Sequence, residues 1–314
     1  MAQRPHWLLS SVNADCTAML RAHGLRVEEV TEIIAMAISE DLEGGPDLTT
    51  ISTVPKDQVS VIELTARATG VVAGAVVAAA VFDMVTRSEM ELEIVTPDGV
   101  VVNPGDVILR VKGKTLSLLT AERTALNFLG HLSGVATLTS KWVDAIAGTD
   151  AKIRDTRKTT PGMRRLEKWA VRCGGGVNHR MSLGDAALIK DNHVIAAGGV
   201  VEAFEAVRKR FPEISVEVEV DTLEQLYKVV EAGADLVLLD NFDLASIRKA
   251  VEWTAGRAKL EASGGLTIDT APAYAALGVD YLAVGALTHS APVLDIGADL
   301  RAIPEEESVN VVSN

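Results

Sequence analysis

Short apolar segments alternate with amphipathic helical patterns through the second half of the chain. The helical patterns include residues 199–211 and 222–234, where apolar side chains recur at three- and four-residue spacing. The last four apolar segments begin about every 20 to 23 residues, a rhythm typical of a parallel barrel in which strands and helices alternate. We therefore predict parallel strands at residues 152–154, 187–190, 216–220, 236–239, 259–262 and 281–284, and a seventh near Val177.

The first 120 residues follow a different pattern. A helical pattern over residues 27–42 precedes strand-like runs, among them 60–66 and 107–111, which indicates an α+β unit. A long helix is predicted from Thr120, whose hydroxyl can cap the first turn. About 195 residues remain after Thr120, whereas a complete eight-stranded barrel takes about 250. We therefore predict a smaller or open barrel.

Composition is that of a folded globular protein, with 48% hydrophobic and 23% charged residues among 314. The longest uncharged apolar run, 70–82, has 13 residues, too few for a membrane span of about 18 to 20. The first 16 residues lack the apolar segment of a secretory signal, so we predict a cytoplasmic protein. Cys16 and Cys173 predict plain thiols, and no Cys or His cluster has metal-ligand spacing.

Charge is unevenly distributed along the chain. The net charge is −13, yet residues 152–193 hold ten of the thirty Lys and Arg residues against four acids, a local charge of +6. An acidic remainder argues against duplex nucleic acid, which needs a broad basic face. A local basic pocket suits a small anion better.

Polar residues follow every predicted barrel strand. In parallel barrels the active site lies at the carboxyl ends of the strands, so these residues are predicted to meet there. They are Arg157 and Lys158; Lys190, Asp191 and Asn192; Glu219 and Asp221; Asp240 and Asn241; Ser263, Gly264 and Gly265; and Gly285 and Ala286.

The strand sequence EVEVD, residues 217–221, predicts that its three acids share one face. A solvated edge strand is the plain alternative, but helical patterns flank both ends of this strand. Carboxylates that point into a barrel mouth are costly unless cations or a metal pair with them. The basic segment can supply that pairing.

Three further patterns have a plain structural interpretation beside a functional one. ASGG (262–265) and AVGA (283–286) favour a phosphate-binding backbone at the barrel's late strands, although a glycine after a strand is commonly only a turn. Residues 164–172 predict a solvated basic helix face, with Lys168 among its cations, over Leu166, Trp169 and Ala170. For His179, in NHR, the sequence does not decide between a structural and a catalytic role.

Ordered along the chain, several motifs resemble one known family. They are KIRDTRKTTPG, GGGVNHR, LIKDNH, VEVEVDTLEQ, LLDNF, EASGGL and VDYLAVGALTHS. These strings resemble those of the quinolinate phosphoribosyltransferases, also called nicotinate-nucleotide pyrophosphorylases (carboxylating). The resemblance covers roughly residues 25–300.

The resemblance implies both a fold and a reaction. The fold is an open-faced α/β sandwich followed by an incomplete, seven-stranded α/β barrel. We thus expect an N-terminal extension (1–24), a sandwich domain (25–119), a barrel domain (120–290) and a C-terminal segment (291–314) that returns to the sandwich. The reaction, part of NAD synthesis, makes nicotinate mononucleotide, CO₂ and pyrophosphate from quinolinate and phosphoribosyl pyrophosphate, with Mg²⁺. Both substrates are polyanions, which explains a cationic pocket on an acidic protein.

The resemblance also assigns roles to individual residues. Arg123 resembles an arginine that reaches quinolinate from the neighbouring subunit of a homodimer. Glu219 and Asp240 are similar to the acids that hold the ribose hydroxyls and Mg²⁺, and Lys190 is expected to act in catalysis with them. The expected quinolinate-facing set is Arg157, His179, Arg180 and Lys190. Lys158 is expected close to the pyrophosphate, with Thr156 lining the same loop. The backbone expected to cradle the 5′-phosphate is that of Ser263, Gly264, Gly265, Gly285 and Ala286.

Three rival functions remain open at this point. One is a phosphoribosyltransferase that uses nicotinate without decarboxylation, against which the dense cation set argues. Another is a non-catalytic phosphosugar-binding protein, against which Glu219, Asp240 and Lys190 argue. The last is an RNA-binding module over residues 152–180, which the acidic remainder disfavours.

Overall fold

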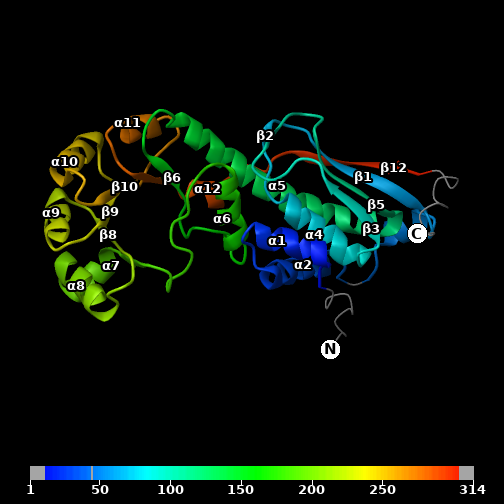
Figure 1. The fold of residues 1–314 in the computed structure, drawn as a ribbon, viewed down its shortest axis with the longest axis horizontal. Helices are drawn as coiled ribbons and strands as arrows, with labels where there is room; N and C mark the ends of the chain where they lie inside the picture. The colour runs from blue at the N-terminus through cyan, green and yellow to red at the C-terminus, as the bar shows by residue number, and fades with distance from the viewer. Residues whose placement is uncertain (1–10, 44, 304–314) are drawn as a thin grey trace. The chain divides into compact units, whose positions relative to one another are not determined.

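The computed structural model describes residues 11–43 and 45–303. The chain divides into two compact units (Figure 1). The first comprises the described residues up to 137, together with 165–173 and those from 291 onward, and the second comprises 138–164 and 174–290. The structure is thus α/β, with an antiparallel sheet in the first unit and a parallel sheet in the second, as predicted.

A four-stranded antiparallel sheet organises the first unit. Its strand order is β12-β1-β5-β3, and strands β2 and β4 form a separate two-stranded sheet. The C-terminal strand β12 pairs with β1 over seven residues, from Ser60–Ala302 to Ala66–Ile296. The bounds are β1 Val59–Ala66, β2 Gly70–Val71, β3 Met90–Ile94, β4 Val101–Val102, β5 Val107–Lys114 and β12 Ile296–Ala302.

The two faces of this sheet differ in character. On one face Ile62, Leu64, Leu109 and Val111 are fully buried, and the almost wholly apolar helix α4 (Ala75–Thr86) contacts β3 and β5. The other face carries a ladder of ion pairs, in which Arg110 bridges Glu63 and Glu93 across three strands. This alternation follows from the two-residue period of a strand. Helices α1 (Ala14–Ala22), α2 (Val27–Asp41) and α3 (Leu48–Thr53) complete the unit's N-terminal part.

Asn13 attaches α1 to the rest of the first unit. Its backbone N–H and its side-chain amide both donate to the carboxylate of Asp83, which is buried within α4. Nine residues of the predicted N-terminal extension (1–24), Ala14–Ala22, therefore form a packed helix, while residues 1–10 lie outside the described part. Residues 304–314 of the predicted C-terminal segment lie outside it as well.

Helix α5 (Thr115–Ala145) starts earlier than predicted. Thr120 does not cap its first turn, because the helix begins five residues before it and the Thr120 hydroxyl donates to the Leu116 carbonyl inside the helix. The division between the units therefore falls at 137/138, within this helix, and not at the expected 119/120. Helix α6 (Arg164–Cys173) is also counted largely with the first unit, which interrupts the expected barrel segment.

The second unit is built on a parallel sheet of order β6-β11-β10-β9-β8-β7. Val177 extends it by a single parallel bridge to Arg154, so the predicted seventh strand is reduced to one bridge. Helices α8, α9 and α10 lie outside the sheet (Figure 1). The strands are β6 Lys152–Arg154, β7 Ala187–Ile189, β8 Val216–Val220, β9 Leu236–Asp240, β10 Lys259–Ser263 and β11 Tyr281–Ala283; the helices are α7 Asp191–Ala197, α8 Val200–Arg210, α9 Leu223–Glu231, α10 Leu244–Thr254, α11 Ala271–Ala275 and α12 Ala286–His289.

The prediction that α6 has a solvated basic face is wrong at Lys168. Lys168 is fully buried, as is its neighbour Glu167, whereas Trp169, predicted to be buried, is partly exposed. Glu167 lies 3.0 Å from Nε2 of His131, and the Trp169 indole donates to Asp98. The charges of this helix thus turn partly inward, where buried partners can hold them.

No transmembrane helix is found in the part of the chain that the structure describes, since none of its helices combines sufficient length with sufficient apolar character.

Candidate active site

The carboxyl ends of the barrel strands bring acids and lysines together. Lys190, directly after β7, places Nζ 2.7 Å from Oε2 of Glu219 on β8. The Glu219 side chain is 11% exposed, whereas Lys190 is about half exposed. The backbone of Lys190 is fixed at the start of α7, where its N–H donates to Nδ1 of His193. A lysine at this mouth is therefore held by an acid of the neighbouring strand.

Asp240, at the end of β9, lies in the electrostatic field of the same group. Partial burial raises the pKa of Asp240, and the nearby negative charges of Glu219 and Asp221 raise it further, while Lys190 and Lys158 oppose the shift. Asn241 donates a 2.7 Å hydrogen bond to Oδ2 of Asp240. The predicted acids and lysines are thus neighbours in space.

Two glycine positions allow close backbone approach at this end of the barrel. Gly264 has φ +89°, and a side chain there would collide with Oδ1 of Asn241. At Gly285, a Cβ would lie 3.1 Å from Cδ of Lys158, so the lysine stem passes directly over this glycine. Larger residues at either position would displace a polar side chain of the mouth.

The loop after β6 is folded against the β11–α12 junction. The Lys158 N–H donates to Oγ1 of Thr156, and the Lys158 carbonyl accepts a 2.7 Å hydrogen bond from the hydroxyl of Thr288. These bonds place Thr156, Arg157 and Lys158 beside the glycine loop that follows β11. The order of the sheet explains this, because β6 and β11 are adjacent.

Arg157 and Arg180 form the cationic part of the site. Partial burial and the charge of Arg157 both lower the pKa of the Arg180 guanidinium. Arg180 donates from Nη1 to the carbonyl of Ala186 at 2.9 Å. Nε of each arginine is buried and, among the described residues, has no hydrogen-bond partner. A buried donor without a partner is costly, so an anion that accepts these two N–H groups would bind favourably.

Beneath the mouth, three charged residues fill the barrel interior. Arg154 on β6 contacts Glu261 on β10 at 2.6 Å and Glu217 on β8 at 3.7 Å. Both acids are buried, and burial together with the charge of Glu217 raises the pKa of Glu261. The Arg154 guanidinium also lies over the ring of Tyr281. The sequence predicted that cations of the basic segment pair with the acids of residues 217–221, as Arg154 does with Glu217, but it did not point to Glu261.

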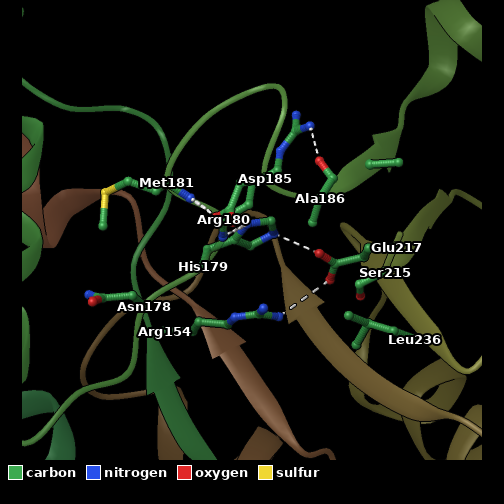
Figure 2. A pocket seen from close by; sticks show the side chains of 11 residues that line it. Arg154, Asn178, His179, Arg180, Met181, Asp185, Ala186, Ser215, Glu217 and Leu236 are labelled. Atoms are coloured by element: carbon green, nitrogen blue, oxygen red, sulfur yellow. Dashed lines mark hydrogen bonds and ion pairs between the residues drawn. The ribbon is translucent and has the colours of Figure 1, made fainter. Parts of the chain in front are cut away.

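His179 joins the buried triad to Arg180. Its Nε2 lies 2.6 Å from Oε2 of Glu217, and its Nδ1 accepts the backbone N–H of Arg180. A cavity of about 400 Å³ opens beside these residues (Figure 2). Its lining residues are Arg154, Asn178, His179, Arg180, Met181, Asp185, Ala186, Ala187, Ser215, Glu217 and Leu236.

Comparison with known proteins shows the family to which this chain belongs. A model of the quinolinate phosphoribosyl transferase C-terminal domain matches residues 135–299, and one of the N-terminal domain matches residues 47–133. The chain belongs to the quinolinate phosphoribosyltransferase family. The family resemblance predicted from the motifs is therefore confirmed.

Individual relatives extend the family match over most of the chain. A nicotinate-nucleotide pyrophosphorylase (carboxylating) of Mycobacterium leprae is 52% identical over 273 residues, which cover 86% of this chain and 96% of that protein. A probable enzyme of the same name from Bacillus subtilis is 40% identical over 83% of this chain and 90% of its own length. The crystal structure of NadC from Streptococcus pyogenes has 38% identity and a TM-score of 0.85, and the match covers 89% of this chain and 99% of that one.

The structure gathers many, but not all, of the residues expected from the family resemblance. Lys158, Lys190, Glu219 and Asp240 are electrostatic neighbours, and Gly285 lies under Lys158. Arg123 is different, because it lies on α5 in the first unit. His179 is buried with a protein partner at each ring nitrogen. Ser263, Gly265 and Ala286 lie at the ends of β10 and β11, where the sequence predicts them.

Two groups of acids offer candidate metal ligands. Within the described residues, ligand atoms of His179, Glu217 and Glu261 lie within 4.8 Å of one another. Arg154 already supplies a cation to that cluster, which disfavours a metal ion there. The carboxylates of Glu219 and Asp240 offer the hard oxygen donors that Mg²⁺ prefers. Those residues fit the expected magnesium.

Proposed function

We propose that the protein transfers the phosphoribosyl group of phosphoribosyl pyrophosphate to quinolinate, with loss of CO₂, to give nicotinate mononucleotide and pyrophosphate. The observation that carries this proposal is the meeting of Lys190, Glu219 and Asp240 at one end of the barrel. Such a group combines acids for a developing sugar cation with a cation for an anionic substrate.

Quinolinate binding is assigned to the basic residues of the site. Its two carboxylates need several donors, and the partnerless Nε groups of Arg157 and Arg180 can meet one of them. Lys190 supplies a further positive charge from β7. Because Arg180 is partly buried, its interaction with a carboxylate is screened less than it would be on an open surface.

Phosphoribosyl transfer proceeds by attack of the quinolinate ring nitrogen on ribose C1. The C1–O bond to pyrophosphate breaks as the C–N bond forms, and positive charge develops on the sugar. Glu219 and Asp240 stabilise that charge when ionised, while Lys158 offsets the negative charge of the leaving group. Glu219 and Asp240 would hold Mg²⁺, which would supply further neutralisation of the leaving group's charge. The backbone around Gly264, Gly265, Gly285 and Ala286, together with Ser263, binds the 5′-phosphate.

Decarboxylation follows transfer for an electronic reason. The attached ribose makes the pyridine nitrogen cationic, so the electron pair left at C2 when the bond to CO₂ breaks is stabilised by the adjacent charge. That pair then takes a proton from solvent. Lys190 or Arg180 holds the remaining carboxylate, which leaves the C2 carboxylate with fewer cations to stabilise it.

We further propose that the working unit is a homodimer in the cytoplasm, in which Arg123 of one subunit reaches the quinolinate of the other. The family resemblance supports this assignment, and Arg123 lies on the long helix α5. A shared arginine would complete the set of cations that a dicarboxylate needs.

The test is an assay of the purified protein with Mg²⁺, phosphoribosyl pyrophosphate and quinolinate. Nicotinate mononucleotide and CO₂ should form in equal amounts. Product formation from nicotinate, without CO₂, would instead favour a non-decarboxylating phosphoribosyltransferase. Binding of phosphoribosyl pyrophosphate without turnover would favour a phosphosugar-binding protein, and a strongly salt-dependent gel shift with RNA would favour the RNA-binding alternative.

A further inference from the structure

The ring of His179 has a protein partner at each nitrogen. Nδ1 accepts a 2.7 Å hydrogen bond from the backbone N–H of Arg180. A nitrogen that accepts a hydrogen bond carries no proton, so the neutral ring carries its proton on Nε2. Nε2 in turn faces Oε2 of Glu217 at 2.6 Å (Figure 2). Both nitrogens therefore face protein atoms, a backbone N–H on one side and a carboxylate oxygen on the other.

The backbone of the same residue is fixed as well. The His179 N–H donates to Oδ1 of Asp155 at 2.8 Å, and the Asn178 amide donates to the other oxygen of that carboxylate. Asp155 is fully buried directly after β6. The imidazole thus projects from an anchored backbone toward β8.

Glu217 is held from its opposite side. Nη1 of Arg154 lies 3.7 Å from its Oε1 and donates to Glu261 at 2.6 Å. The guanidinium is confined in turn by the ring of Tyr281, 4.7 Å from its centroid. Arg154, which is itself held by Glu261 and Tyr281, therefore flanks the carboxylate that faces the imidazole. A network that reaches across the barrel has the rigidity needed to fix a ring orientation.

We propose that His179 and Glu217 are positioning residues that act through Arg180, and that His179 is not itself a quinolinate ligand. The inference rests on the proposed function, in which Arg180 binds a quinolinate carboxylate. Glu217 fixes the ring, the ring holds the backbone of Arg180, and the Ala186 carbonyl holds its Nη1. Arg180 is then held at its backbone N–H and at Nη1, and its buried Nε remains available for the substrate.

Two substitutions of His179 separate the ring nitrogens. In His179→Asn, the amide oxygen can replace Nδ1 as the acceptor for Arg180, but nothing reaches Glu217. In His179→Gln, the amide nitrogen can replace Nε2 and donate to Glu217, but the acceptor for Arg180 is lost. Calorimetry on the full chain would measure the Kd of quinolinate and of phosphoribosyl pyrophosphate for each variant.

The proposal expects unequal losses for one ligand only. The Kd of quinolinate should rise less than threefold in His179→Asn and at least tenfold in His179→Gln. The Kd of phosphoribosyl pyrophosphate should stay within twofold of the wild-type value in both variants. Equal losses of quinolinate affinity would mean that the ring meets the substrate directly, and would overturn the proposal. The reverse order, or no loss in either variant, would overturn it too.

Glu217 provides the second pair of variants, in case His179→Gln does not fold. Glu217→Gln keeps an oxygen that can accept from Nε2, whereas Glu217→Ala does not. Quinolinate affinity should be largely retained in the first and fall at least fivefold in the second, with equal circular dichroism spectra. Equal affinities in this pair would contradict the role of Glu217. If the wild-type protein neither binds quinolinate nor forms nicotinate mononucleotide, the proposed function fails, which is a distinct result.

Discussion

Nζ of Lys190 and Oε2 of Glu219 lie 2.7 Å apart, so the residue after β7 and an acid of β8 form one electrostatic unit. Asp240 belongs to the same unit, because Glu219 raises its pKa and Lys190 lowers it. The ionisation of Asp240 therefore depends first on its partial burial and then on the charges around it, Glu219 and Lys190 among them. This dependence can be tested one residue at a time.

Replacing Lys190 by Ala should shift the acidic limb of the pH profile of kcat/KM to higher pH. Asp240 must be ionised to stabilise a developing sugar cation, and loss of the Lys190 charge raises the pKa of Asp240 above its already raised value. The measurement is kcat/KM for phosphoribosyl pyrophosphate from pH 5 to 9. Lys190→Arg, which keeps the charge, serves as the control, and Glu219→Gln should move the limb the other way. An unmoved limb in Lys190→Ala would contradict the coupling.

Glu261→Gln should make the protein more stable than the wild type at alkaline pH. The pKa of Glu261 is raised in the folded protein, so between its ordinary value of 4.5 and the raised value the folded state binds a proton that the unfolded state lacks. Wild-type stability therefore falls as pH rises through that window, by up to about 1.4 kcal/mol per pH unit. Thermal unfolding at several pH values measures this slope. A slope equal in both proteins would show that Glu261 is ionised throughout.

The double substitution of Glu217 and Glu261 by Gln should cost far more than the sum of the single ones. Arg154 lies within 4 Å of both acids, and either single variant leaves it one carboxyl group. The double variant leaves a largely buried guanidinium with neither acid, which costs about 3–5 kcal/mol. Chemical denaturation of the four proteins completes the cycle. Additive losses would mean that Arg154 does not depend on this pair.

Gly264→Ala should impair phosphoribosyl pyrophosphate binding more than its backbone strain explains. Position 264 has φ +89°, and its new methyl group would collide with the Asn241 side chain, which donates to Asp240. Gly233→Ala is the matched control, because Gly233 has φ +96° and no atom within 4 Å of an added Cβ. Both variants should lose roughly 1 kcal/mol of stability from φ alone. We expect a KM increase of tenfold or more in Gly264→Ala only, and similar KM values in both would contradict this.

Mixed dimers test the proposed position of Arg123. Arg123→Ala and Lys190→Ala chains should each be nearly inactive alone. Mixed together, they should recover up to about a quarter of wild-type activity, because one of the two sites in a hybrid dimer would be intact. Differently tagged chains allow the hybrid to be isolated before the assay. An isolated hybrid without activity would argue against an arginine shared between subunits.

Much of the barrel and of its mouth could be predicted from the sequence. The strand at Val216–Val220 and its inward acids follow from strict alternation, and Lys190, Glu219 and Asp240 follow from their positions at strand ends. Such features depend on local patterns, which a single sequence displays. The fold class could be predicted from the sequence for the same reason.

The buried charges could not be predicted in the same way. Arg154 and Glu261 are 107 residues apart, and their pairing depends on β6 and β10 lying on either side of β11 in the sheet. Lys168 looked like a surface residue because cations flank it in a basic helix, yet it is fully buried. The start of α5 was also misplaced, since Gly113 and Lys114 still belong to β5 and nothing in the sequence marks the change to helix at Thr115.

The pairing of β12 with β1 has a consequence for how the chain folds during translation. Strand β1 leaves the ribosome long before β12, with the whole parallel sheet encoded between them. Domains generally fold in the order of their emergence, but here the earlier sheet must wait with an open edge until translation is nearly finished. A nascent chain arrested before residue 296 should therefore hold a completed parallel sheet and an unfinished antiparallel one, a state in which chaperones have an exposed strand to protect.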